Sequence, residues 1–269
     1  MEHLERWGRS NLMSTALEAI VEGVLEDLQK RIVPLSQLRE ALENAPAIRS
    51  AYDALNRPGT QIIAEVKRSS PSKGALATIS DPVKLAMEYQ DADAAVVSVL
   101  TEPRRFAGSS ADLVAVRREL SIPILRKDFI VTEFQVLETR VLGADLMLLI
   151  VAALSDSQLT DFSQMASELG MDVLVEVHDE AELERAVDSG ASIIGVNARN
   201  LKTLEINPDA FARLIPMIPG EVLRVAESGI ASREQVAVAE EAGAKAILVG
   251  ETLVKSGDPK EMIRTLLAR

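Results

Sequence analysis

The stretch IIAEVK, residues 62–67, is a short apolar run that ends in a glutamate and a lysine. Later runs end in the same way: ILRK (124–127), VLVE (173–176), IIGVN (193–197) and VLRVAE (222–227). An ion at the end of a buried strand costs several kcal/mol of desolvation unless it has a partner. Because helical patterns separate these runs, we expect parallel strands whose polar ends meet at one edge of the sheet. That edge is the candidate functional site.

Strands and helices are predicted to alternate from residue 61 onward. Strand-like runs begin near residues 61, 93, 122, 144, 172, 192, 222 and 246. Helical patterns cover about 83–91, 110–120, 132–141, 156–169, 179–189, 207–215, 232–242 and 258–269. Capping boxes at TEFQ (132–135) and SREQ (232–235) mark two of the helix starts. The pattern predicts an α/β fold, a (β/α)8 TIM barrel, which typically takes about 250 residues.

The alternative is a doubly wound open sheet. Its first turn is normally a glycine-rich dinucleotide fingerprint, whereas RSSPSKG (68–74) follows the first strand here. Before the barrel, residues 10–30 and 35–44 have helical spacing, and Pro34 separates them. We therefore expect residues 1–60 to be a helical extension packed on the barrel and residues 61–269 to form the barrel, in a single domain overall.

Composition narrows the class of protein. The net charge of −12 over 269 residues argues against nucleic-acid or anionic membrane partners. With no cysteine, disulfides, thiolate metal sites and cysteine nucleophiles are excluded. The longest apolar stretch, residues 146–154, is too short to span a bilayer, and the start of the chain has no apolar signal core. We expect a cytoplasmic protein, a monomer or a weak homodimer, with a small-molecule partner.

Glu65 and Lys67 share a strand face because side chains alternate along a strand. Opposite charges so placed can keep each other ionised inside the barrel, either as a structural ion pair or as part of a site. The following loop, Ser69–Gly74, offers hydroxyls, backbone N–H groups and a cation that would suit an anion.

Lys127 ends its strand beside Arg126, and only one of the two can point into the barrel. A lysine there is either a snorkelling surface group or a catalytic acid, base or Schiff-base former. Glu176 lies between apolar neighbours, which is the setting of a general acid or base, although a structural pair with a buried lysine is the alternative. Neither His178 nor His3 suggests a metal site; we expect His178 to start the next helix and assign it no role.

Asn197 and Arg199 share a face and could orient an oxygen-rich substrate. The last two strands end in AESGI (226–230) and LVGETL (248–253). Barrel enzymes frequently bind phosphate between these two loops and a short helix. Gly229 and Gly250 would admit backbone donors, Ser228 would add a hydroxyl, and residues 250–255 are long enough for one helical turn.

Together these motifs resemble the indole-3-glycerol phosphate synthase family of barrel enzymes. The matching pieces fall in family order across residues 60–255: IIAEVKRSSPSKG (62–74), SVLTEPRRFAGS (98–109), ILRKDFIV (124–131), LVEVH (174–178), GVNARNL (195–201), AESGI (226–230) and LVGETL (248–253). Two departures are minor. Ala198 stands where asparagine or serine often occurs, and Glu251 stands where some members have serine.

The resemblance implies the substrate 1-(2-carboxyphenylamino)-1-deoxyribulose 5-phosphate. Ring closure, decarboxylation and dehydration would give indole-3-glycerol phosphate without a metal or organic cofactor. By family analogy Lys127 is the general acid, Glu176 the general base of the dehydration, and Asn197 orients the intermediate. Lys67, kept charged by Glu65, would meet the anthranilate carboxylate or the sugar oxygens. Glu227 would complete the lysine–carboxylate network, and both lysines can donate a proton.

The resemblance also implies the binding residues. Phosphate would lie on N–H groups of Ser228, Gly229, Gly250 and Glu251, with Ser70 and Ser72 nearby and Arg199 alongside. The apolar wall for the anthranilate ring would come from Pro71, Leu100, Phe106 and Phe129.

Other barrel functions fit less well. Phosphoribosylanthranilate isomerase is similar at the last two strands but uses a cysteine base, and this chain has no cysteine. Barrel cyclases of the histidine pathway use two aspartates at strand ends, where this chain has Glu, Lys and Asn. A non-catalytic phosphometabolite-binding barrel would keep the glycines yet could lose Lys127 or Glu176, and both are present.

Overall fold

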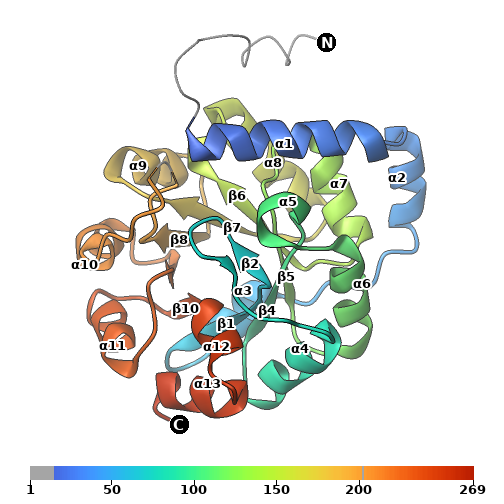
Figure 1. Cartoon of the computed structure of the whole chain (residues 1–269). Coiled ribbons are helices and arrows are strands. Elements are labelled where there is room, and N and C mark those ends of the chain that lie inside the picture. The colour runs from blue at the N-terminus through green and yellow to red at the C-terminus, as the bar shows by residue number, and fades with distance from the viewer. Residues whose placement is uncertain (1–14, 202) are drawn as a thin grey trace.

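The computed structural model describes residues 15–201 and 203–269. His3 and the start of the helix predicted over 10–30 lie outside these residues. Within the described chain, parallel strands close into a barrel, which confirms the predicted TIM-barrel fold (Figure 1). The barrel strands, in chain order, are β1 (Gln61–Val66), β4 (Val96–Leu100), β5 (Ile124–Lys127), β6 (Leu146–Ile150), β7 (Asp172–Val177), β8 (Ile193–Asn197), β9 (Leu223–Glu227) and β10 (Ala246–Val249).

Helices surround the barrel in the positions that the sequence patterns predict (Figure 1). Several begin at a side-chain cap; for example, the Thr132 hydroxyl accepts a hydrogen bond from the backbone N–H of Gln135. The outer helices are α4 (Pro82–Asp91), α6 (Ser110–Glu119), α7 (Glu133–Val141), α8 (Asp156–Glu168), α9 (Glu180–Asp188), α10 (Ala210–Leu214), α11 (Arg233–Glu241) and α13 (Pro259–Leu267).

Short elements modify the loops at the carboxyl ends of the strands. The loop after β1 contains a small hairpin, β2 (Ser69–Ser70) and β3 (Gly74–Ala75), which the sequence did not predict. While η3 (Ile215–Met217) directly follows α10 and leads to the amino end of β9, the other short helices are α5 (Pro103–Phe106), η2 (Val151–Ala153) and α12 (Glu251–Lys255). The last of these is the single helical turn expected over residues 250–255.

The segment before the barrel runs from one end of the barrel to the other. Its helices are α1 (Ala16–Arg31), α2 (Leu35–Leu42) and α3 (Ala51–Leu55). At the carboxyl end of the strands, Asp27 of α1 pairs with Arg104 of α5. At the amino end, the Asp172 carboxylate accepts hydrogen bonds from the backbone N–H groups of Ala51 and Tyr52. The segment is thus fixed at both ends of the barrel.

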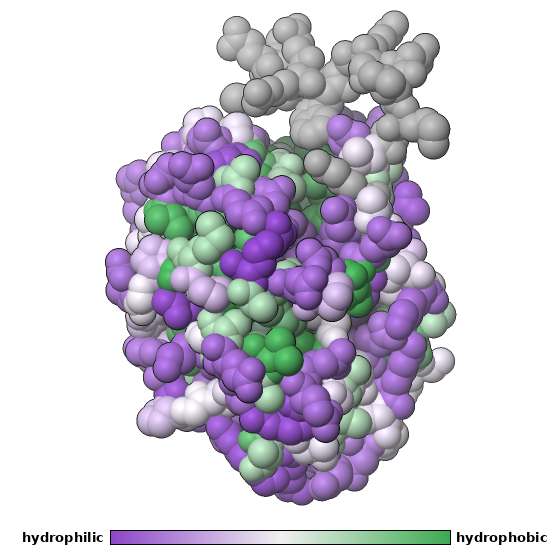
Figure 2. Space-filling view, turned by 90° about the vertical axis from the view of Figure 1, so that its left-hand side faces the viewer, coloured by the Kyte–Doolittle hydropathy of each residue, from purple (hydrophilic) through white to green (hydrophobic). Residues whose placement is uncertain are grey.

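The surface shows no continuous apolar area on the face drawn in Figure 2, where green patches are separated by hydrophilic ones. The large apolar side chains that are exposed, such as Met217 and Val238, lie on different elements. No helix among residues 15–201 and 203–269 is both long enough and apolar enough to cross a membrane.

Candidate active site

A lysine surrounded by carboxylates lies at the carboxyl end of the barrel. The Lys127 Nζ atom is 2.7 Å from Oε2 of Glu176 and 2.9 Å from Oε2 of Glu227. The three side chains come from β5, β7 and β9, so the barrel closure brings together residues that are far apart in the sequence. Both carboxylates are almost fully buried, and the lysine side chain is 13% exposed at the floor of a pocket.

Charge, rather than burial, decides the protonation of Lys127. Burial alone would lower the pKa of its ammonium group, but the carboxylates of Glu176, Glu227 and Glu65 outweigh burial and raise the pKa above its ordinary value. The side chain is therefore a cation at neutral pH and carries protons that it can donate.

The two carboxylates around Lys127 differ in their surroundings. Burial raises the pKa of Glu227 to about 7, opposed by the charge of Lys127 and reinforced by that of Glu176. Burial would also raise the pKa of Glu176, but Lys127 and His178 hold it well below its ordinary value. Glu176 is thus the ionised member, and Glu227 is the member that can take up or release a proton near neutrality.

Glu65 and Lys67 form the second ion pair of the pocket, as their shared strand face predicts. The Lys67 Nζ atom lies 3.2 Å from Oε1 of Glu65. The buried Ser98 hydroxyl of β4 donates to Oε2 of Glu65 at 3.4 Å. Lys67 also lies 5.6 Å from the centre of the Phe106 ring, within the range of a cation–π contact.

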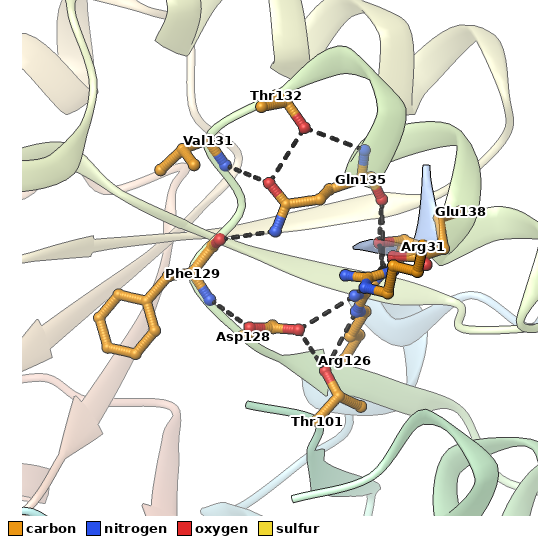
Figure 3. Close-up of polar contacts among 10 residues, drawn as sticks. Arg31, Thr101, Arg126, Asp128, Phe129, Val131, Thr132, Gln135 and Glu138 are labelled. Carbon is orange, nitrogen blue, oxygen red and sulfur yellow. Dashed lines mark hydrogen bonds and ion pairs between the residues drawn. The ribbon is translucent and has the colours of Figure 1, made fainter. Parts of the chain in front are cut away.

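Arg126 and Lys127 point in opposite directions, which settles the orientation that sequence parity left open. The Arg126 guanidinium is buried outside the barrel, where it donates to Oδ2 of Asp128 at 3.0 Å and to Oε2 of Glu138 at 2.8 Å (Figure 3). Glu138 also pairs with Arg31 of α1. This network fixes the end of β5, so Lys127 faces the pocket.

The predicted apolar wall lines one side of this pocket. The Phe106 and Phe129 rings have their centres 6.1 Å apart, and Ile20 of α1 lines the same pocket. The residues of this compartment that the sequence had singled out are Glu65, Lys67, Ser70, Pro71, Ser72, Leu100, Phe106, Lys127, Phe129, Glu176, Asn197, Arg199, Glu227 and Ser228.

A second compartment adjoins the first and shares with it Glu65, Lys67, Arg199, Ser228 and Leu248. It is lined by the ends of β9 and β10 and by the start of α12, and it includes Gly229, Gly250 and Glu251. Every predicted site residue therefore lines one of the two compartments.

The backbone at the second compartment has an unusual conformation. Ser228 and Gly229 both have positive φ angles, 67° and 73°. Gly250 lies so close to β1 that a β-carbon there would be 2.5 Å from Oε1 of Glu65. The Glu251 carboxylate is neutralised by Lys73 at 2.6 Å and Lys255 at 2.9 Å.

Sequence reasoning missed His178, to which it gave no role. Its ring lies beside Glu176 in the structure, with Nε2 3.2 Å from Oε1. The signal was available, because residues 176 and 178 have the same strand parity. Ser98 and Ile20 were also missed. No group of three or more His, Cys, Asp or Glu side chains in the described part of the chain could hold a metal ion.

Comparisons with known proteins agree on one family. The family model described as indole-3-glycerol phosphate synthase matches residues 17–266. A relative of that name from Parafrankia sp. (strain EAN1pec) is 52% identical over 254 residues, covering 94% of this chain and 95% of the relative. Another of that name, from Mycobacterium avium (strain 104), is 51% identical over 256 residues, covering 94% of each chain.

Solved structures support the fold alone. The 3-hexulose-6-phosphate synthase from Salmonella typhimurium matches with a TM-score of 0.64 at 15% identity, covering 78% of this chain and 97% of that one. A thiamine phosphate pyrophosphorylase from Pyrococcus furiosus matches with a TM-score of 0.59 at 12% identity, covering 81% and 96%.

Proposed function

The chain belongs to the indole-3-glycerol phosphate synthase family, and on this premise we propose how its pocket carries out the family reaction. Membership makes it a carboxy-lyase of tryptophan biosynthesis. The substrate is 1-(2-carboxyphenylamino)-1-deoxyribulose 5-phosphate, and the products are indole-3-glycerol phosphate, carbon dioxide and water. The observation that carries the mechanism is the position of Lys127 between Glu176 and Glu227.

Ring closure requires an acid. The aromatic carbon that bears the carboxylate attacks the ketone carbon, and the ketone oxygen gains negative charge as the new carbon–carbon bond forms. A buried cation near that oxygen stabilises the charge much more than water would. Lys127 supplies both the charge and a proton, which makes the oxygen a hydroxyl. Loss of carbon dioxide then restores the aromatic ring.

Dehydration requires a base and an acid together. The hydroxyl leaves as water when an acid protonates it, while a base removes the proton that completes the indole double bond. Glu176 is the base, and the amide of Asn197 donates to its Oε1 at 3.0 Å and orients it. Glu227 returns a proton to Lys127 after ring closure, so that Lys127 can then protonate the leaving hydroxyl.

The remaining residues bind the two ends of the substrate. Lys67, charged beside Glu65, lies at the edge of the aromatic wall and meets the anthranilate carboxylate. The second compartment takes the phosphate on backbone N–H groups of Ser228, Gly229, Gly250 and Glu251, with Arg199 and the Ser70–Ser72 loop nearby.

Residues 1–60 serve as an extension of the barrel formed by 61–269, a division supported by the contacts of α1 and α3 with opposite barrel ends. The absence of cysteine and the net charge of −12 support a cytoplasmic enzyme with no nucleic-acid partner, working as a monomer or weak homodimer.

The test is direct conversion of the substrate, followed by the appearance of indole fluorescence. We expect Lys127→Ala and Glu176→Gln each to lower kcat by about 100-fold or more at unchanged folding, since each removes a group that moves a proton. Lys84→Ala, at an exposed lysine on α4, is the control and should retain full activity. Normal turnover in either active-site variant would remove that residue from the mechanism.

A further inference from the structure

His178 lies immediately after β7 and connects the active site to α9. Its Nδ1 atom is 2.9 Å from Oε2 of Glu182, and the same carboxylate oxygen accepts a hydrogen bond from the His178 backbone N–H at 2.9 Å. Glu182 thus holds both the ring and the backbone of one residue. The His178 side chain is only 10% exposed, so these contacts fix the orientation of the ring.

The other side of the ring faces the active site. The buried Nε2 atom lies 3.2 Å from Oε1 of Glu176, an ion-pair distance, and makes no hydrogen bond to the described residues. Oε1 also accepts the Asn197 amide, and Oε2 accepts from Lys127. Glu176 is therefore surrounded by one amide and two groups that can carry positive charge, whereas Oε1 of Glu227 has no partner among the described residues.

We propose that His178 is a positioning residue for the reaction, held by Glu182 so that its Nε2 face aligns the Glu176 carboxylate beside Lys127. The inference rests on the role of base proposed above for Glu176. A carboxylate tied at both oxygens to fixed groups cannot rotate away from the position that the reaction needs, and small misplacements of a catalytic group are costly.

The charges around the ring support its cationic form. Burial alone would lower the pKa of His178, but its contacts with Glu176 and Glu182 raise the pKa to about 10. Behind the ring is a cavity whose other charged lining groups are Asp179 and, from α10, Arg213. Arg213 pairs with Glu180 at 2.7 Å, which offsets its charge. The groups in direct contact with the ring are thus both carboxylates.

His178→Gln tests the charge of the ring, because an amide is polar and can face Glu176 but cannot become a cation. Without that cation the pKa of Glu176 rises, so a smaller fraction of Glu176 is ionised at acidic pH. The acidic limb of the pH profile of kcat should therefore move up by about 1 pH unit. We expect kcat to fall about 10- to 100-fold with KM changed less than about twofold.

Two variants in α9 separate positioning from folding. Glu182→Gln should lower kcat, because the ring loses one of the two carboxylates that hold it, but it should not raise the acidic limb, since the ring is still a cation in acid. Glu184→Gln removes an exposed carboxylate of the same helix, and it should leave both quantities unchanged.

The inference would be overturned if His178→Gln kept its acidic limb and its kcat within twofold of the wild type while Glu176→Gln remained inactive. A lower melting temperature of His178→Gln with an unchanged acidic limb of kcat would also overturn the inference, since that result describes a purely structural side chain. If Glu176→Gln itself were fully active, the role proposed for Glu176 would fail, which is a separate result.

Discussion

Gly195 of β8 lies directly against the Glu227 carboxylate of β9: a β-carbon at residue 195 would be 2.0 Å from Oε1 of Glu227. Both residues are buried, and Asn197, two residues further along β8, faces the same pocket. The absence of a side chain at residue 195 therefore creates the space in which Glu227 reaches Lys127. The glycine of β8 thus leaves space for the Glu227 side chain of the neighbouring strand β9.

Gly195→Ala should impair catalysis more than folding. The new methyl group would displace the flexible end of Glu227 rather than the backbone, so Glu227 would lose its 2.9 Å contact with Lys127. We expect kcat to fall about 10- to 100-fold, measured by substrate conversion. Gly220→Ala is the control, because a β-carbon there meets nothing within 4 Å. Equal kcat values for the two variants would show that Glu227 tolerates displacement.

Glu227 should make the stability of the protein depend on pH. Its pKa rises from an ordinary value of 4.5 to about 7 on folding, so between these values the folded state binds a proton that the unfolded state has lost. This contribution is complete below pH 4.5 and is lost as the pH rises through 7, by at most ~1.4 kcal/mol per pH unit.

Glu227→Gln removes that titration and keeps the shape of the side chain. Urea unfolding of both proteins from pH 4 to about 8 gives the difference in unfolding free energy, wild type minus variant, and we expect it to decline with pH. A constant difference would mean that Glu227 has the same pKa in the folded and unfolded states.

Patterns within single strands predicted much of this site. Alternation placed Glu65 and Lys67 on one face, and the apolar runs ending in polar residues located the carboxyl edge of the barrel. Parity could not decide between Arg126 and Lys127, because both faces of β5 carry polar partners: Asp128 and Glu138 receive the arginine outside, and Glu176 receives the lysine inside.

Patterns in the sequence could not predict contacts between segments that are distant along the chain. Ile20 belongs to α1, and its place in the pocket depends on how that helix docks on the barrel through pairs such as Asp27 with Arg104. His178 has the parity of Glu176, but it was assigned to the start of the next helix, where a strand pattern no longer applies. Its partner Glu182 comes from that helix.

We expect Ile20 to give α1 a direct part in binding the substrate. The side chain is 5% exposed and lines the pocket beside the aromatic wall. Ile20→Ala should raise KM several-fold because it opens that wall, and it should cost about 2 kcal/mol or more of stability. Leu28→Ala, at a buried residue of α1 outside the pocket, should lower stability to a similar degree without changing KM. If the two variants had the same KM, α1 would only brace the barrel and would not contact the substrate.

The second compartment should bind inorganic phosphate in competition with the substrate. Its backbone donors lie at Ser228, Gly229 and the start of α12, while the nearby Glu251 carboxylate opposes an anion. Lys73 and Lys255 hold the pKa of Glu251 below its ordinary value against the effect of burial, so this carboxylate is charged at neutral pH. Removing that charge frees both lysines to attract phosphate. Glu251→Gln should therefore lower the inhibition constant of phosphate about two- to fivefold, a change of ~0.4–1 kcal/mol.

Inhibition assays at several substrate concentrations give this constant for the wild type and for Glu251→Gln. Glu261→Gln, at an exposed residue of α13, is the control and should leave it unchanged. Because screening weakens the attraction between phosphate and the freed lysines, the difference between wild type and Glu251→Gln should shrink at high salt. Non-competitive inhibition by phosphate would place the anion elsewhere, since we expect competition only if inorganic phosphate and the substrate's phosphate group occupy the same compartment.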